Sequence, residues 1–221
     1  MVNLVIRKKN PDRDFFGFKM RTRLRYYDEK ILNEELDPQK NIYAIPDNPK
    51  MVVDIGAHIG GTALRCAKMG AKVRAFEPEA DNFDTLVYNV ALNKMEDRIV
   101  CKFAGVGSPG IKELYLHPRM SGTNSIYLNQ SGLHEKEYQM ALFLSIGQVL
   151  KDIEYCDLLK LDCEGSEEDI IRDFNDQLAA KVSQISVEFH DKHKVKELID
   201  ILSKWYKPEN IHRYEWVFTK K

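Results

Sequence analysis

The sequence predicts an α/β protein in which a mostly parallel sheet of seven strands is covered by helices on both faces. Two observations predict this class. Short apolar runs alternate with amphipathic helical patterns from residue 51 onward, and the first run ends in a glycine turn that leads into a helix,. Strands that alternate with helices need right-handed crossovers, which build a parallel sheet between two helical layers.

The first half of the pattern begins with a buried strand that starts at Met51 and a helix over residues 62–69,. A second strand covers residues 72–76. Asp81 is expected to cap the next helix, and a third strand covers residues 99–104,. The apolar residues of that helix recur at helical spacing and should face the sheet: Phe83, Leu86, Val87 and Val90.

The second half contains two extended segments, residues 111–116 and 140–144, before the fourth strand. A short helix follows them, because Ser145 and Gln148 have the spacing of a capping box,. The later strands of the sheet are expected at residues 158–162, 184–189 and 216–219.

Two further helices separate these later strands. Ser166 and Asp169 form a second box at the start of one of them. Its buried stripe consists of Ile170, Ile171, Phe174 and Leu178. The apolar stripe of the last long helix consists of Val195, Leu198, Ile199, Leu202 and Trp205.

The turn after the first strand has the pattern of a nucleoside-binding site. Gly56 allows a sharp exit from the strand, and Gly60 lets the following helix pack closely,. Glu77 ends the second strand 21 positions after Gly56, where it can accept hydrogen bonds from ribose hydroxyls,. Ligands of such sheets bind beyond the carboxyl ends of the strands, and Asp54, Glu77, Ala104, Asp162 and His190 all fall at such ends,.

The residue in the middle of the turn decides between two cofactors. A dinucleotide site needs glycine there, so that the backbone can approach a pyrophosphate, and this chain has His58,. S-adenosylmethionine has no phosphate, and its ammonium group could be accepted by Asp54 just before the turn. The sequence therefore favours S-adenosylmethionine over NAD. Asn82 is a further candidate cofactor ligand, although helix-start chemistry explains it equally well.

A second motif, Asp157-Leu158-Leu159-Lys160-Leu161-Asp162-Cys163-Glu164-Gly165-Ser166-Glu167, closely resembles the signature of the FkbM-family methyltransferases. The glycine turn is similar to the same family's turn, although His58 replaces a more usual asparagine. The resemblance covers roughly residues 45–195 and extends to Phe76-Glu77-Pro78, to Asn89 and Asn93, and to Val187-Glu188-Phe189-His190. It implies a Rossmann-like class I methyltransferase fold and O-methylation of sugars, polyketides or other secondary metabolites.

Methyl transfer to a hydroxyl needs a group that takes up the proton, and Asp162, Glu164 and His190 are the candidates. Lys160, Asp162 and Glu164 alternate along one strand, so we expect Lys160 to pair with a carboxylate while Asp162 and Glu164 lie at the open end. A metal site is not assigned. Glu188, His190 and His193 form the one combination that the sequence leaves open.

Composition narrows the remaining alternatives. The 221 residues are 43% hydrophobic and 30% charged, as in one globular domain, and the net charge of −1 gives no global field for nucleic acid or membrane,. No apolar run is long enough to span a bilayer, and the four cysteines, which show no zinc-like spacing, are interpreted as small buried residues in a reducing compartment, so we expect a cytoplasmic protein,. A methyltransferase of RNA or protein is the first alternative function, and an NAD-dependent oxidoreductase is the second.

The first 45 residues precede the cofactor motif and are interpreted as an extension to a domain of residues 46–221. Arg21, Arg23 and Arg25 alternate, so on a strand they would face one side,. One interpretation is that carboxylates such as Asp28 and Glu29 neutralise a solvated face. The other is that the extension forms a lid whose arginines select an anionic acceptor, since a guanidinium group can bind a phosphate or carboxylate at two points.

Overall fold

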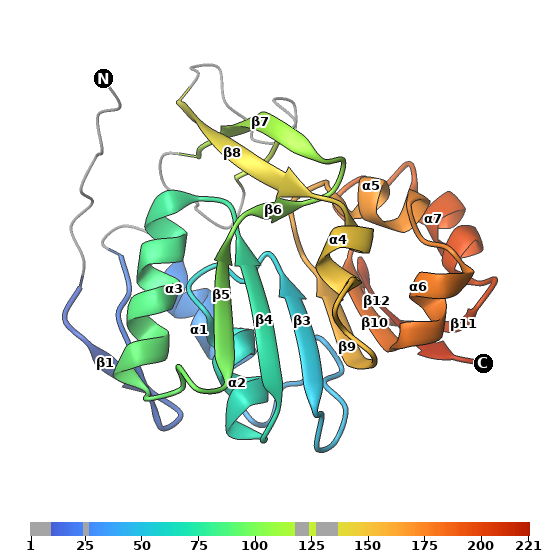
Figure 1. Ribbon diagram of the computed structural model, residues 1–221. Helices are drawn as coiled ribbons and strands as arrows, with labels where there is room; N and C mark the ends of the chain where they lie inside the picture. The colour runs from blue at the N-terminus through green and yellow to red at the C-terminus, as the bar shows by residue number, and fades with distance from the viewer. Residues whose placement is uncertain (1–9, 24–26, 118–123, 127–136) are drawn as a thin grey trace.

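A computed structural model of the chain describes residues 10–23, 27–117, 124–126 and 137–221. Its centre is a seven-stranded sheet with the order β11-β12-β10-β9-β3-β4-β5 (Figure 1). Five neighbouring strands are parallel, and β12 runs antiparallel to both of its neighbours. The predicted fold class is therefore confirmed. In sheet order the strands are β11 (Tyr206–His212), β12 (Glu215–Lys220), β10 (Val182–Glu188), β9 (Cys156–Leu161), β3 (Met51–Ile55), β4 (Lys72–Glu77) and β5 (Ile99–Phe103).

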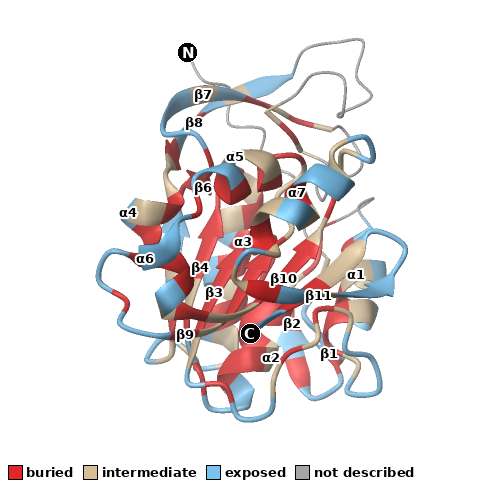
Figure 2. Ribbon diagram, turned by 90° about the vertical axis from the view of Figure 1, so that its right-hand side faces the viewer, coloured by how far each residue is buried: buried red, intermediate tan, exposed pale blue. Residues whose placement is uncertain are grey.

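Helices cover both faces of this sheet. The first layer consists of α1 (Asp28–Glu35), α2 (Gly61–Lys68) and α3 (Ala80–Leu92). The second consists of α4 (Ile146–Leu150), α5 (Glu167–Arg172), α6 (Asp176–Lys181) and α7 (Val195–Leu202). Neighbouring residues of β3 serve the two layers, since Val52 packs into the first core and Val53 into the second, as strand periodicity requires,. Figure 2 shows the resulting buried strands between partly exposed helices. None of the helices in the described ranges is long and apolar enough to cross a membrane.

The N-terminal segment is built onto the first helical layer. Its strands β1 (Arg13–Phe15) and β2 (Phe18–Met20) form an antiparallel hairpin, and Phe15, Phe18 and Met20 belong to the same core as α2 and α3. Two asparagine side chains at the end of α3 bind the backbone of this segment, since Asn89 accepts from Arg21 N–H at 2.7 Å and Asn93 accepts from Lys19 N–H at 3.0 Å. The segment thus shares its core with the rest of the chain.

A small second sheet lies near the upper ends of β4 and β5 in Figure 1. It contains β6 (Gly105–Val106), β7 (Gly110–Tyr115) and β8 (Tyr138–Leu144), in the order β6-β8-β7. The two extended segments predicted before the fourth strand are therefore confirmed. The predicted capping box is confirmed as well, because Ser145 and Gln148 exchange both hydrogen bonds at the start of α4.

Two local predictions were wrong and one strand was not predicted, each for an identifiable reason. Glu79 rather than Asp81 caps α3, and its side chain accepts the amide protons of Asp81 and Asn82. The helix expected from Ser166 to Leu178 is two helices, because Asn175 caps a new one at α6, and Ser166 makes no capping bond with its side chain,. Strand β11 was missed, since Pro208 and its charged neighbours hide the apolar pattern at a sheet edge,.

The helix after Glu79 also exposes one residue of its expected apolar stripe. Leu86 and Val90 are buried against the sheet, whereas 43% of Val87 is exposed. The stripe is therefore narrower than predicted, and this does not alter how α3 packs.

The position of a ligand site follows from the order of the strands. The chain crosses from β3 to β4 on one side and returns to β9 on the other, so the order reverses between β3 and β9. Loops after these two strands leave toward opposite faces and open a crevice at their carboxyl ends.

Candidate active site at the switch point

A cavity of about 640 Å³ opens at the carboxyl ends of the strands. Its walls come from the turn after β3, the ends of β4, β9 and β10, helix α1, the small sheet and the β11–β12 hairpin. This volume lies within the range of small-molecule and cofactor sites. We call Gly56, His58, Glu77 and Asn82 the turn side of this cavity. The strand-end side consists of Asp162, Glu164 and Glu188, which line the cavity, and of His190, which contacts Asp162 and Glu164 from behind the wall.

The glycine turn packs directly against the residue that follows β9. Gly56 has a φ of +78°, and a Cβ atom at this position would lie 1.7 Å from the carbonyl oxygen of Asp162. No side chain fits there, so glycine is needed both for the backbone conformation and for the close approach. Gly60 has a φ of +98° and caps α2 beside Leu86, and it does not line the cavity. Its role is the close helix packing that the sequence predicted.

Asp54 lies beneath the turn rather than in the cavity wall. It is fully buried, and its Oδ1 atom is 3.2 Å from Nζ of Lys160. The same ammonium group donates to the carbonyl oxygen of Gly56 at 2.8 Å. Burial would lower the pKa of Lys160, but the carboxylates of Asp54 and Asp162 raise it, so the lysine stays charged. The predicted pairing of Lys160 is confirmed, and Asp54 supports the turn instead of facing a ligand.

Glu77 is held in place by three donors at the end of β4. Its Oε2 atom accepts from the His58 amide at 2.9 Å, and its Oε1 atom accepts from the Glu79 amide at 2.9 Å and from Nδ2 of Asn82 at 3.0 Å. Burial raises the pKa of Glu77 to about 7. The residue lines the cavity together with His58 and Asn82, so three of the predicted cofactor residues meet on one wall.

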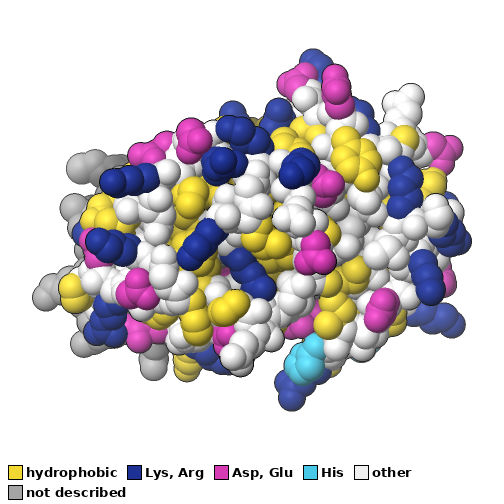
Figure 3. All heavy atoms as spheres, turned by 90° about the horizontal axis from the view of Figure 1, so that it is seen from below, with side chains coloured by type: hydrophobic (Ala, Val, Ile, Leu, Met, Phe, Trp, Pro, Cys, Tyr) yellow, Lys and Arg dark blue, Asp and Glu magenta, His cyan; other side chains and the backbone are white. Residues whose placement is uncertain are grey.

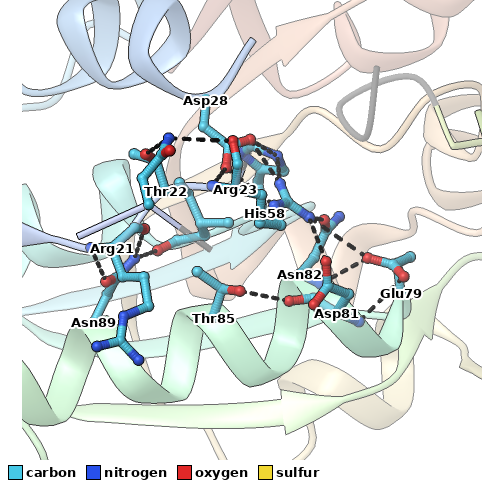
Figure 4. A network of polar contacts seen from close by, with 12 residues as sticks. Arg21, Thr22, Arg23, Asp28, His58, Glu79, Asp81, Asn82, Thr85 and Asn89 are labelled. Atoms are coloured by element: carbon cyan, nitrogen blue, oxygen red, sulfur yellow. Dashed lines mark hydrogen bonds and ion pairs between the residues drawn. The ribbon is translucent and has the colours of Figure 1, made fainter. Parts of the chain in front are cut away.

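A buried arginine from the N-terminal segment fixes two of these neighbours (Figure 4). The side chain of Arg23 has no exposed surface and forms a two-point contact with the carboxylate of Asp28. It also donates to Oδ1 of Asn82, and its Nη2 atom is 2.7 Å from Nε2 of His58. Burial and the positive charge of Arg23 lower the pKa of His58 to about 3, so the imidazole is neutral and accepts this hydrogen bond.

The arginines of the N-terminal segment therefore do not line one face of a strand. Strand β2 ends at Met20, so Arg21 and Arg23 follow it rather than lie on it. Arg21 is partly exposed and pairs with Asp12 at 2.8 Å, whereas Arg23 is buried with Asp28. Arg25 falls outside the described residues. The prediction that carboxylates neutralise these arginines is correct for Arg21 and Arg23, but the pair of Arg23 is buried and not solvated.

On the strand-end side, Asp162 is held by a tyrosine that also lines the cavity and that the sequence analysis missed. The hydroxyl group of Tyr43 donates to Oδ2 of Asp162 at 2.6 Å, and Nζ of Lys160 is 3.6 Å from the same oxygen. Burial would raise the pKa of Asp162, but Lys160 and His190 lower it, so the carboxylate is ionised. Tyr43 carries no motif and lies 119 positions before its partner, so only the folded chain identifies it.

His190 is oriented by a buried glutamate. Its Nδ1 atom is 3.1 Å from Oε1 of Glu167, whose two carboxylate oxygens also accept the amide protons of Cys163 and Gly165. The Nε2 atom of the same ring lies 3.5 Å from Glu164 and 3.8 Å from Asp162. Glu167 therefore does more than compensate the dipole of α5, because it fixes both the loop and the ring.

Burial and neighbouring charges shift pKa values strongly on this side. Burial raises the pKa of Glu164 to about 8, and Glu164 also has a strained φ of +54°. Burial would lower the pKa of His190, but Glu167 and Glu164 raise it well above its usual range. Asp162 and Glu164 line the cavity, and His190 contacts both of them from just behind the wall. All three predicted catalytic residues therefore meet at one edge of the sheet.

Three side chains on the strand-end side could hold a metal ion. Asp162, Glu188 and His190 each offer one ligand atom, and these atoms lie within 4.8 Å of one another. The sequence had left open a group of Glu188, His190 and His193, and in the structure Asp162 joins Glu188 and His190 instead of His193.

Ala104, which was predicted to contact the cofactor, does not line the cavity, although its neighbour Gly105 does.

Comparisons with known proteins relate the chain to methyltransferases. The sequence model of the family described as Methyltransferase FkbM domain matches residues 54–210. Methyltransferase sdnD of Sordaria araneosa is 25% identical over 193 residues, covering 73% of this chain and 74% of that protein. Methyltransferase 1 of Beauveria bassiana (strain ARSEF 2860) is 24% identical over 178 residues, covering 71% and 70%.

A similar solved structure is the precorrin-6y C5,15-methyltransferase of Geobacter metallireducens GS-15, with a TM-score of 0.48 and 10% identity over 87% of this chain and 89% of that one. The sheet order, the glycine turn and the family match together define the class of this protein, a methyltransferase with a Rossmann-like α/β fold. Within that class, the chain belongs to the FkbM methyltransferase family.

Proposed function

We propose that the protein transfers a methyl group from S-adenosylmethionine to a hydroxyl group of a small molecule such as a sugar, a glycan or another metabolite. One observation carries this proposal. A single cavity is lined on its turn side by residues suited to a nucleoside and on its strand-end side by groups that can accept a proton. The two sides touch where Gly56 meets the carbonyl group of Asp162.

The turn side supports a nucleoside without a pyrophosphate. Glu77 lines the cavity, and its carboxylate oxygens can accept further hydrogen bonds from ribose hydroxyls in addition to those they already accept,. His58 occupies the position where a dinucleotide site requires glycine,. Both features favour S-adenosylmethionine over NAD.

The strand-end side supports oxygen as the atom that is methylated. The leaving group of a sulfonium is already activated, so the protein mainly has to align acceptor and methyl group and take up a proton. The imidazole Nε2 atom of His190 lies within 3.8 Å of both Asp162 and Glu164. At least one of these three groups accepts the hydroxyl proton.

Calorimetry with S-adenosylhomocysteine is the direct test of the cofactor, with NAD as the comparison ligand. We expect S-adenosylhomocysteine to bind and NAD not to bind. Tight binding of NAD without any response to S-adenosylhomocysteine would overturn the proposal.

Transfer of a labelled methyl group to a panel of neutral and phosphorylated sugars, RNA and protein then tests the acceptor. Incorporation into RNA or protein alone would favour the macromolecular alternative. On the face shown in Figure 3, which lies away from the carboxyl ends of the strands, Lys and Arg side chains are mixed with Asp, Glu and hydrophobic side chains. A preference for phosphorylated sugars would support an anionic acceptor. Arg23 would not be the residue that binds it, because Arg23 is buried with Asp28.

Substitutions on the strand-end side test the base. Asp162→Asn, Glu164→Gln and His190→Gln each remove one candidate, and loss of the base should lower turnover by about 10²–10⁴-fold. Binding of S-adenosylhomocysteine should change far less, since the turn side is intact. Near-native turnover in all three variants would place the base elsewhere.

A further inference from the structure

We propose that Asp162, Glu188 and His190 form a binding site for a divalent cation of the Mn²⁺ type, on the wall of the cavity where the methyl acceptor would bind. The three ligand atoms lie within 4.8 Å of one another, at the ends of the neighbouring strands β9 and β10. Two carboxylates and one imidazole are ligands that such cations accept, and the open cavity leaves positions for water or an acceptor oxygen,.

The imidazole of His190 is oriented as a metal-binding histidine would be. Its Nδ1 atom is bound to the carboxylate of Glu167, which in turn is fixed by two backbone amides. A carboxylate behind Nδ1 is the usual arrangement of a metal-binding histidine, because it fixes the ring and leaves Nε2 facing the metal. Here Nε2 faces Asp162 and Glu164, so its surroundings are negative.

The carboxylate of Asp162 is also held in a fixed orientation. The hydroxyl group of Tyr43 and the ammonium group of Lys160 hold its Oδ2 atom, at 2.6 Å and 3.6 Å. The other oxygen, Oδ1, is the one that faces His190, at 3.8 Å. Asp162 and His190 are therefore each held through one atom by the protein, and their other atoms, Oδ1 and Nε2, face each other.

Glu188 completes the group. It lines the cavity, and among the described residues its carboxylate forms neither a hydrogen bond nor a salt bridge. The nearby carboxylate of Asp162 repels that of Glu188, and the charges of His190 and Lys160 offset this repulsion only in part,. A divalent cation at this point would offset it further and join all three ligands.

The consequence for catalysis rests on the proposed function. A bound cation lowers the pKa of an acceptor hydroxyl, and Glu164, 3.5 Å from His190 and outside the ligand group, is left to take the proton,. Asp162 and His190 would then act as ligands rather than as bases. Metal binding itself does not depend on this step and can be measured without an acceptor.

The experiment is a titration of the chelator-treated full-length protein with Mn²⁺, in which electron paramagnetic resonance measures the free ion. We expect one Mn²⁺ per chain, with affinity at least tenfold weaker in Glu188→Gln and in His190→Gln. Glu215→Gln is the matched control, because Glu215 pairs with Glu188 across the sheet and lines the cavity but offers no ligand to the group. Its affinity should stay within about threefold of the wild type.

Several results would overturn the site. They are no binding at millimolar Mn²⁺, unchanged binding in both ligand variants, or an equal loss in Glu215→Gln, which would indicate only diffuse attraction by carboxylates. Thermal unfolding of each variant confirms that it is folded. Glu167→Gln keeps the three ligand residues but removes the carboxylate that orients the ring of His190, so it should also weaken binding. Calorimetry with S-adenosylhomocysteine on the same samples keeps this result separate from the proposed function, since either can fail alone.

Discussion

The two sides of the cavity differ in how completely their charged and polar side chains are paired. On the turn side, the charged and polar groups around Glu77 are bound to one another, and the buried Arg23 contacts Asp28, Asn82 and His58. On the strand-end side, Asp162 and His190 are each held at one atom, and Glu188 is not held by any described side chain. The comparison indicates that full pairing fixes the shape of the turn side, whereas the strand-end side keeps groups available for chemistry.

Removal of Arg23 should have the largest effect on stability. Arg23→Gln leaves the buried carboxylate of Asp28 without its partner, and breaking a buried pair in this way costs about 3–5 kcal/mol,. Urea denaturation measures the free energy of unfolding. Arg21→Gln is the control, because its partly exposed pair with Asp12 is worth no more than about 1 kcal/mol,. Equal stability of the two variants would mean that the pairing of Arg23 does not fix the turn side.

Removal of Glu77 should act on the cofactor rather than on the acceptor. Glu77→Ala should weaken S-adenosylhomocysteine binding by about 1.5–3 kcal/mol, the range for hydrogen bonds to a charged group. Calorimetry measures this change. Glu79→Ala removes a neighbouring carboxylate that caps α3 and does not line the cavity, so it serves as the control. An unchanged affinity in the Glu77 variant would show that this carboxylate does not hold the ribose.

Gly56 is the point where the two sides meet, and its replacement by alanine should damage both. A Cβ atom at Gly56 collides with the backbone of Asp162, and such overpacking costs about 1–3 kcal/mol,. Gly70→Ala is matched to it, since Gly70 also has a positive φ, but a Cβ atom there would meet no described atom within 4 Å. Denaturation of the two variants isolates the collision from the backbone strain. If they are equally stable, the contact with Asp162 is not tight.

The pH dependence of cofactor binding should be the smallest effect. The pKa of Glu77 is raised by burial to about 7, and ribose hydroxyls donate to the ionised form. Affinity for S-adenosylhomocysteine should therefore fall about fivefold as the pH drops from 7 to 6, and rise by no more than about twofold above pH 7. Calorimetry at several pH values checks this, and Glu77→Gln should remove the dependence.

Folding stability should respond to Glu77 in the opposite direction. Its pKa in the folded chain, about 7, exceeds its ordinary value of 4.5, so the folded state binds more protons than the unfolded state between these values. The contribution of this group is fully present below 4.5 and is lost as the pH rises through 7,. A contribution from Glu77 that grows over this range, seen as the difference from Glu77→Gln, would contradict the burial of the carboxylate.

Local patterns in the sequence were sufficient wherever the physical cause is local. The glycine turn, the acidic residue after the second strand and the capping box of Ser145 and Gln148 all depend on neighbours within a few positions, and the structure contains each of them. The strand ends of Asp162 and His190 could be placed beside each other because parallel strands bring their carboxyl ends to one edge,. These regularities determined the fold class, the family and the position of the cavity.

Only the tertiary structure decided which polar groups became partners. Asp54 was predicted to face the cofactor, but Lys160 holds it beneath the turn. Arg23 was expected on one face of a strand, either neutralised in solvent or facing an anionic acceptor, but it is buried beside His58. Tyr43 was not singled out at all. Such pairs join residues far apart in the chain, and their energies depend on burial and on distances that no sequence pattern records. The sequence thus determined where the site lies, and packing decided which side chains support it and which face the ligand.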